Sequence, residues 1–230
     1  MNDISSKFYN AFIAKDRWQL YIQGLGVTLE IAFFAGILGI IIGCIVALMK
    51  LSEPAKGRRH SALWYVATAY VDIIRGTPSM LQLLIMWFVI FSTSKNGVLV
   101  ASLSFGINSG AYVSEIIRAG ILAVDKGQME AGRSLGLSKA QTMKEIILPQ
   151  AFKNVLPPIG NEFITLLKET AIVGYVSLSD LTRTASQISS RTYEAFMPLI
   201  GAAVIYFVII KILSLLLESL ERRLRRSDNR

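Results

Sequence analysis

The sequence has only one cysteine, Cys44, and only one histidine, His60, among its 230 residues. A single cysteine excludes a framework of intrachain disulfides, and a single histidine excludes the HExxH zinc motif. No glycine is followed directly by lysine, so the chain lacks the GxxxxGK[ST] loop that cradles nucleotide phosphates. An intramembrane enzyme would have to use carboxylates such as Asp72 and Glu115, which is a weak case. We therefore expect no catalytic residue, no metal site and no ATP-hydrolysing site in this chain.

Charged residues are also few, at 17%, whereas 53% of the residues are hydrophobic and the mean hydropathy is positive. This composition is typical of a polytopic helical membrane protein rather than of a soluble domain. Ile31 to Met49 holds 19 residues without a charge, which is long enough to span a bilayer and too long for the core of a signal peptide. The net charge of +8 does not indicate nucleic-acid binding, because the basic residues flank apolar runs.

The apolar runs predict an all-α polytopic membrane protein with about five transmembrane helices, which form a single domain over residues 1–230. The expected spans cover residues 20–50, 60–92, 97–122, 155–176 and 195–220. Positive residues are concentrated in three connecting or terminal segments, at 50–59, in the loop 123–154 and at 222–230. Because such residues stay on the cytoplasmic side, we expect the amino terminus outside, and the loop and carboxy terminus in the cytoplasm.

The second expected span is too long for a straight transmembrane helix. Residues 60–92 would extend for roughly 50 Å at about 1.5 Å per residue, whereas a hydrocarbon core is roughly 30 Å thick. Gly76, Thr77 and Pro78 supply a natural break, and transporters use the backbone groups freed by such breaks to hold substrate. If the break rotates the helix little, one polar face would hold Thr68, Asp72, Arg75, Ser79 and Gln82.

Polar residues recur at helical spacing on three expected spans, although each ionisable group costs about 2.5 to 3.5 kcal/mol at mid-membrane. We interpret these stripes as walls of one internal cavity, where freed backbone amides meet a carboxylate and a side-chain carboxylate meets an ammonium group. The alternative is structural, since Asp72 with Arg75 and Glu115 with Arg118 are pairs that can neutralise each other. The candidate substrate-binding residues are Arg75, Gly76, Thr77, Pro78, Gln82, Tyr112, Glu115, Asn161, Glu162 and Thr165.

A polar island from Glu130 to Gln150 lies inside the loop 123–154. Ser138 followed by Gln141 fits a capping box, so we expect a helix to begin there and to stop at Pro149, which prevents a regular continuation. An apolar face of this helix would hold Met143, Ile146 and Ile147. That face would either dock into the groove of a partner or fold back on its own bundle.

The island resembles the cytoplasmic coupling loop of the membrane subunits of binding-protein-dependent ABC importers, whose motif is EAA, then G, then I-x-LP. The matching residues are Glu130, Ala131, Gly132, Gly136, Ile146, Leu148 and Pro149, with Gly132 standing where the motif commonly has alanine. Nearly the whole chain is similar to the polar amino acid permease family of type I ABC importers. The segments that carry this likeness are DIIRGTP (72–78), NSGAYVSEIIRAG (108–120), LPQAF (148–152), GNEFITLLKET (160–170) and LTRTASQISSRTYE (181–194).

The resemblance implies a permease that imports a polar amino acid across the bacterial inner membrane at the cost of ATP hydrolysis. It implies a second permease, identical or related, together with two cytoplasmic ATPase subunits and an external solute-binding protein. ATP and magnesium would bind to the ATPases, the matching loop residues would couple them to transport, and this chain would bind neither cofactor nor nucleic acid. An ion channel or another pore-forming subunit is the alternative, although a channel needs no docking loop of this pattern.

Overall fold

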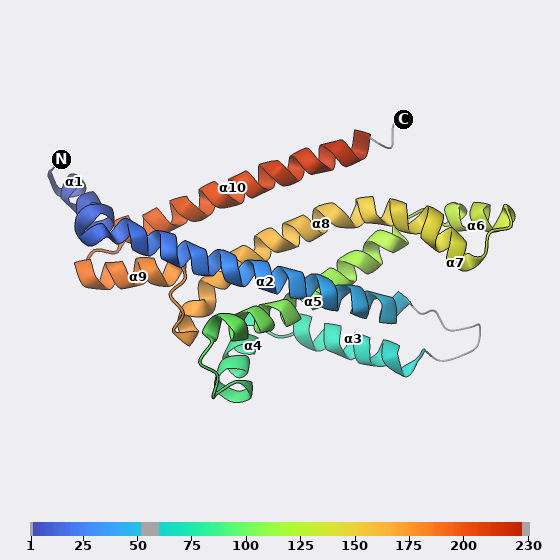
Figure 1. The fold of residues 1–230 in the computed structure, drawn as a ribbon, viewed down its shortest axis with the longest axis horizontal. Coiled ribbons are helices and arrows are strands. Elements are labelled where there is room, and N and C mark those ends of the chain that lie inside the picture. The colour runs from blue at the N-terminus through green and yellow to red at the C-terminus, as the bar shows by residue number, and fades with distance from the viewer. Residues whose placement is uncertain (1, 52–59, 227–230) are drawn as a thin grey trace.

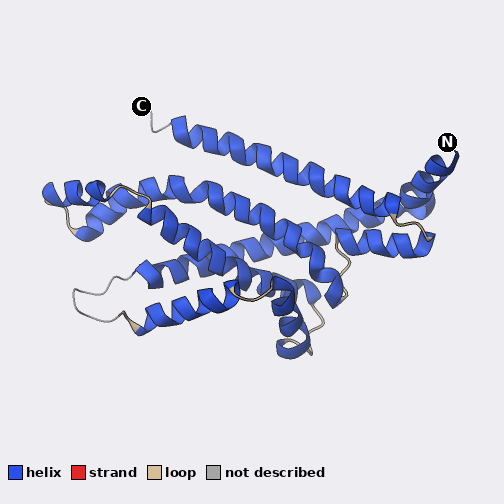
Figure 2. Cartoon of the chain, turned by 180° about the vertical axis from the view of Figure 1, so that it is seen from behind, coloured by secondary structure: helices blue, strands red, loops and turns tan. Residues whose placement is uncertain are grey.

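The computed structural model describes residues 2–51 and 60–226, and within these ranges all regular elements are helical, which confirms the predicted all-α architecture (Figures 1 and 2). The basic residues Lys56, Arg58, Arg59 and Arg230, which contributed to the predicted orientation, lie outside the described ranges. The elements, with η marking 3-10 and π helices, are α1 Asn2–Phe8, η1 Tyr9–Ile13, η2 Ala14–Asp16, α2 Arg17–Leu51, α3 Ala62–Arg75, α4 Ser79–Ile85, η3 Met86–Ile90, α5 Gly97–Leu122, α6 Lys126–Ser134, α7 Lys139–Thr142, η4 Met143–Ile147, α8 Leu148–Glu169, η5 Thr170–Val176, α9 Leu181–Thr192 and α10 Phe196–Arg226.

The helices α2 and α5 run side by side in the same direction, and glycines let their backbones approach closely. A Cβ atom added to Gly43 of α2 would lie 2.5 Å from Cγ1 of Val113, and one added to Gly110 of α5 would lie 2.7 Å from Cγ2 of Ile42. Any larger residue at these positions would force the helices apart. This pair therefore forms a fixed scaffold for the other spans.

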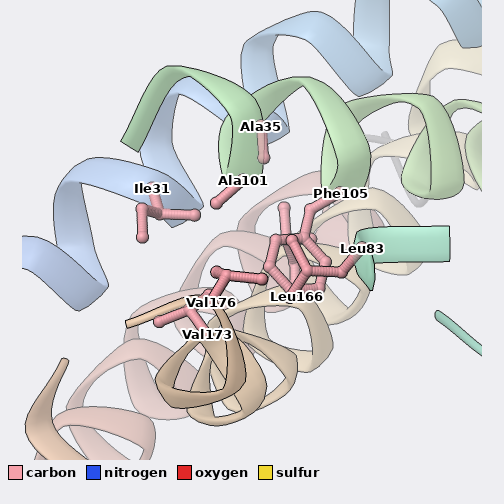
Figure 3. Packing of buried hydrophobic residues seen from close by; sticks show 8 residues of the cluster. All are labelled: Ile31, Ala35, Leu83, Ala101, Phe105, Leu166, Val173 and Val176. Carbon is pink, nitrogen blue, oxygen red and sulfur yellow. The ribbon is translucent and has the colours of Figure 1, made fainter. Parts of the chain in front are cut away.

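A hydrophobic core at one end of this pair joins the second span to α8 (Figure 3). It consists of Ile31 and Ala35 from α2, Leu83 from α4, Ala101 and Phe105 from α5, Leu166 from α8, and Val173 and Val176 from η5. Every one of these residues is at most 1% exposed. Burying each of the large side chains contributes about 1.5 to 3 kcal/mol, so the core fixes the positions of the polar residues carried by the same helices.

Three helical segments among the described residues are long and apolar enough to cross a membrane: Ile4–Leu51, Gly97–Leu122 and Phe196–Leu224. A fourth is obtained if the bent pair Ala62–Arg75 and Ser79–Ile90 counts as one span. The remaining expected span, 155–176, is formed by α8 and η5, but it falls outside this set because polar residues such as Asn161, Glu162 and Lys168 interrupt it. The helix also begins earlier than expected, at Leu148.

The expected break in the second span lies at Gly76 to Pro78, between α3 and α4. The two parts are bent by 104°, so the condition on which one continuous polar face was expected does not hold. Pro78 adopts extended backbone before Ser79, and the amide of Gly76 donates to the carbonyl of Asp72 at 2.9 Å. Because proline disfavours helical geometry in the residue before it, the sequence stops one helix here and starts another in a new direction.

The expectation that the loop helix ends at Pro149 was also wrong. α7, η4 and α8 follow one another without a gap, and Pro149 lies in the first turn of α8. Residues 143–147 form a π-helical turn in which the amide of Leu148 donates to the carbonyl of Met143, five residues earlier. This wider turn gives the proline ring room and tolerates its missing N–H, so the helix passes through the proline.

The short helix α9 is fixed at its start by a buried carboxylate, Asp180, which is 0% exposed. Its two oxygens accept hydrogen bonds from the amides of Thr182 and Arg183, each at 3.0 Å. Burial raises the pKa of Asp180 above its ordinary value, and these hydrogen bonds partly oppose that rise. The cap holds α9 at the same end of the molecule as α1 (Figure 1).

Candidate functional site

The break between α3 and α4 is stabilised by the side chains of Thr77 and Gln82. Oγ1 of Thr77 donates to the carbonyl of Ile73 at 2.8 Å, and Nε2 of Gln82 donates to the carbonyl of Ile74 at 2.8 Å and to Oγ1 of Thr77 at 2.8 Å. Nδ2 of Asn108 on α5 in turn donates to Oε1 of Gln82 at 2.9 Å. Side chains thus satisfy backbone carbonyls at the bend and connect it to α5.

A carboxylate and a guanidinium group flank this part of the bundle. Oγ of Ser109 on α5 donates to Oε1 of Glu162 on α8 at 3.0 Å. Cζ of Arg75 lies 5.1 Å from the centroid of the Tyr112 ring, which is a cation–π contact. Groups of opposite charge therefore stand where α3, α5 and α8 meet.

These contacts bring together five of the predicted substrate-binding residues. We define the central cluster as Arg75, Thr77, Gln82, Asn108, Ser109, Tyr112 and Glu162. Ser109 was missed by sequence reasoning because it stands one position off the polar stripe of its helix, and only its bond to another helix reveals it. A cavity of about 250 Å³ opens beside the cluster and is lined by Thr77, Gln82 and Ser104 together with apolar side chains of α3, α4, η3 and α5.

Glu115 lies in an ion pair. Its Oε1 is 2.5 Å from Nζ of Lys50, and its Oε2 accepts hydrogen bonds from Nε of Arg118 at 3.1 Å and Nη2 of Arg118 at 2.8 Å. The Lys50 and Glu115 side chains are only 11% and 19% exposed. These contacts fit the alternative role of Glu115, in which its ion pairs hold α2 and α5 together rather than bind substrate.

The remaining candidates are placed differently. Gly76 and Pro78 form the backbone of the break, whereas Asn161 and Thr165 are exposed on α8. Asn161 lines a separate cavity of about 600 Å³ between α8 and α10, beside the helix-internal prolines Pro157 and Pro158. Their contact with a substrate, like that of the central cluster, stays a prediction.

The predicted coupling loop lies at the end of the molecule remote from the amino terminus and α9 (Figure 1). The helix α6 ends in a left-handed glycine, Gly136, with a φ of 85°. The amide of Gly136 donates to the carbonyl of Arg133 at 3.1 Å, and the amide of Leu137 donates to the carbonyl of Gly132 at 3.1 Å. This is a Schellman motif, which favours glycine at that position and reverses the chain sharply.

The helix α7 begins with the predicted capping box. The amide of Ser138 donates to Oε1 of Gln141 at 2.8 Å, and the amide of Gln141 donates to Oγ of Ser138 at 3.2 Å. A Cβ atom added to Gly132 would lie 2.5 Å from Cγ2 of Thr142 and 3.1 Å from Cδ1 of Ile146. The close packing of α6 against α7 and η4 thus explains why glycine stands where the motif commonly has alanine.

The apolar face of the loop helix packs on its own chain. Ile147 is 5% exposed and forms a small core with Val124 and Ala151, to which Met143 and Ile146 add partly buried side chains. Exposed instead are Glu130, Ala131, Gly136, Leu148, Pro149 and the 81% exposed side chain of Leu135. A partner would therefore meet this second surface, which we call the loop surface.

The chain is similar to known membrane components of transport systems. Residues 35–226 match the family model described as "Binding-protein-dependent transport system inner membrane component". An arginine transport system permease protein, ArtQ, of Bacillus subtilis (strain 168) is 43% identical over 90% of this chain and 93% of its own length. A putative glutamine transport system permease protein, GlnP, of Rickettsia bellii (strain RML369-C) is 40% identical over 88% of this chain and 92% of its own length.

Solved structures agree with these relatives. A crystal structure of an amino acid ABC transporter with histidines contains a chain that is 46% identical, with a TM-score of 0.82 over 89% of this chain and 94% of that chain. The inward-facing MetNI methionine ABC transporter shares the fold, with a TM-score of 0.79 at 20% identity over 92% of this chain and 99% of that chain. None of these similarities favours the ion-channel alternative. The chain belongs to the family of inner membrane components of binding-protein-dependent transport systems.

Proposed function

We propose that this chain is the permease subunit of an ABC importer that carries a polar amino acid into the bacterial cell. Its relatives are permeases for arginine and, putatively, glutamine, and the central cluster has the chemistry that such substrates share. An amino acid carries an ammonium group and a carboxylate, and the cluster offers Glu162 to the first and Arg75 to the second. The presence of both an acidic and a basic side chain beside a broken helix is the observation that carries the proposal.

The proposed complex contains two permeases, identical or related, two ATPase subunits and an external solute-binding protein. ATP and magnesium bind to the ATPases, which the loop surface meets in the cytoplasm. The end of α2, the loop helices α6 and α7, and the described end of α10 all lie toward one end of the molecule, which supports a single cytoplasmic side (Figure 1). Closure of the ATPase dimer moves the two loops and opens the central cluster alternately to the two sides.

The first prediction concerns the substrate. Glu162→Gln removes a charge that meets the substrate ammonium, and Thr77→Val removes a hydroxyl that holds both Ile73 and Gln82. Losing one hydrogen bond to a charged group costs about 1.5 to 3 kcal/mol, so Glu162→Gln should lower uptake roughly ten- to hundred-fold. Uptake of cationic, amide and acidic amino acids is measured in proteoliposomes with the ATPase and a saturating binding protein.

The matched control is Glu218→Gln, which removes an exposed carboxylate of α10 that pairs with Arg222 on the surface. Its uptake should equal that of the wild type. If Glu162→Gln assembles normally and transports every amino acid at the wild-type rate, the cluster does not contact substrate. Uptake by the wild type without ATP would instead indicate a channel.

The second prediction concerns orientation. In a variant with Cys44→Ala, a cysteine introduced at exposed Ser190 of α9 should react with a membrane-impermeant maleimide applied to intact cells. A cysteine introduced at exposed Ser138 should react only after the membrane is opened, because the loop is cytoplasmic. The opposite labelling pattern would show that the orientation is the reverse of the proposed one, and that the loop does not lie on the side of the ATPase.

A further inference from the structure

The outer surface of the α2–α5 pair carries a carboxylate without a partner. Glu30 is exposed, and neither a hydrogen bond nor an ion pair joins it to any other described residue. Its neighbour Ile31 points toward Ala101 in the core (Figure 3), whereas Phe33 and Phe34 are 55% and 52% exposed. A carboxylate without a partner beside such an apolar surface favours a ligand that combines a cationic group with an apolar part.

Glu30 lies at the edge of a groove of about 240 Å³ between α2 and α5. Phe34, Leu38 and Leu99 form apolar walls, and Asn96 and Ser102 add polar groups. Ser102 is only 5% exposed, and its Oγ has no hydrogen-bond partner within the described part of the chain. The groove therefore has an acidic edge, a buried hydroxyl without a hydrogen-bond partner and apolar walls.

The start of α5 supplies the opposite charge. Oδ1 of Asn96 accepts a hydrogen bond from the amide of Leu99 at 3.0 Å, and its Nδ2 is left to donate. The first amides of α5 have no partners within the helix, and the exposed Lys95 precedes Asn96 in the chain. An anionic group is favoured at this helix end, close to the carboxylate of Glu30.

We propose that this groove binds one phospholipid with a primary ammonium headgroup, namely phosphatidylethanolamine. The ammonium donates to Glu30, the phosphate meets Asn96 and the start of α5, and an acyl chain lies along Phe34, Leu38 and Leu99. Charge complementarity favours this ligand over an apolar helix from a second copy, which would bury Glu30 without a cation. A choline headgroup has no N–H to donate, so the site discriminates against phosphatidylcholine.

The test measures lipid binding to the full permease–ATPase complex. The complex is delipidated in detergent, titrated with palmitoyl-oleoyl phosphatidylethanolamine or phosphatidylcholine, and examined by native mass spectrometry. The wild type should retain one phosphatidylethanolamine per permease at least tenfold more tightly than phosphatidylcholine. Glu30→Gln should lose that preference, Leu99→Trp should weaken binding by filling the groove, and Glu218→Gln, remote from it, should behave as the wild type.

Two further controls identify the ligand. One asks whether a headgroup without acyl chains also binds, and the other asks whether a second permease covers the groove instead. Glycerophosphoethanolamine, which lacks acyl chains, should not compete. A wild type without a headgroup preference, or a Glu30→Gln variant that keeps it, overturns the proposal. So does an efficient disulfide between two copies that carry Leu99→Cys and Cys44→Ala, because a second permease then covers the groove. Binding needs no ATP, so this result is independent of whether the complex imports amino acids.

Discussion

Replacing Gly132 with leucine should abolish substrate-stimulated ATP hydrolysis while the chain still inserts into the membrane. Even a Cβ atom there would lie 2.5 Å from Cγ2 of Thr142, so a leucine must push α6 away from α7 and η4. Such overpacking costs about 1 to 3 kcal/mol and displaces the loop surface, which we propose to meet the ATPase. The stimulation of ATP hydrolysis by the loaded binding protein, measured in proteoliposomes, should fall at least tenfold. Less of the ATPase subunit should copurify with the permease.

The matched control is Gly26→Leu on α2. A Cβ atom at Gly26 would meet no atom within 4 Å, so the same substitution disturbs no packing there. A second variant, Glu130→Lys, reverses an exposed charge of the loop surface and should also reduce stimulation without changing the fold of the loop. Full stimulation in a well-folded Gly132→Leu, Glu130→Lys double variant would show that the loop does not couple the two subunits.

Glu115→Ala should destabilise the permease more than any single change in the central cluster. It leaves the ammonium of Lys50, which is 11% exposed, and the guanidinium of Arg118 without their shared carboxylate. Breaking a buried ion pair costs about 3 to 5 kcal/mol, and the 36% exposure of Arg118 puts the value near the lower end. The unfolding temperature of the purified permease should fall by roughly 6 to 12 °C.

The double variant Lys50→Met with Glu115→Gln removes one charge of each sign and should recover most of that loss. Glu218→Ala breaks a pair whose members are 69% and 56% exposed, and should change stability by less than about 1 kcal/mol. A Glu115→Ala variant that keeps its unfolding temperature but changes its amino acid preference would favour the substrate-binding role predicted from the sequence.

Features that depend on a few neighbouring residues were predicted well. The capping box at Ser138 and the break at Gly76 to Pro78 are confirmed, because each follows from local backbone chemistry. The 104° bend at that break was not predicted, since its angle is set by the packing of Leu83 against Phe105 and Leu166. Pro149 was expected to end the loop helix but does not, because a π-helical turn precedes it and such a turn has no distinct sequence signature.

The central cluster was only partly predictable. Periodicity assigns residues to a face of one helix, and so it found Arg75, Tyr112 and Glu162. It does not say which helices face each other, and so it missed Ser109. It also grouped Asn161 with Glu162, although Asn161 lines the cavity beside α10 and Glu162 accepts a hydrogen bond from α5. Glu115 shows the same limit, because its partner Lys50 lies 65 positions away in the sequence.

If the loop is coupled to the ATPase as proposed, the uninterrupted passage from α7 through Pro149 into α8 acts as a lever. Glu162 stands 14 residues beyond Leu148, which corresponds to roughly 21 Å of helix at about 1.5 Å per residue. A tilt of roughly 5° at the loop would therefore swing the Glu162 carboxylate by about 2 Å, enough to break its 3.0 Å hydrogen bond with Ser109. Pro157 and Pro158 lie along this arm and remove two helical hydrogen bonds, so under the proposed coupling they make the helix easier to bend between the loop and Glu162 and reduce the displacement that reaches Glu162.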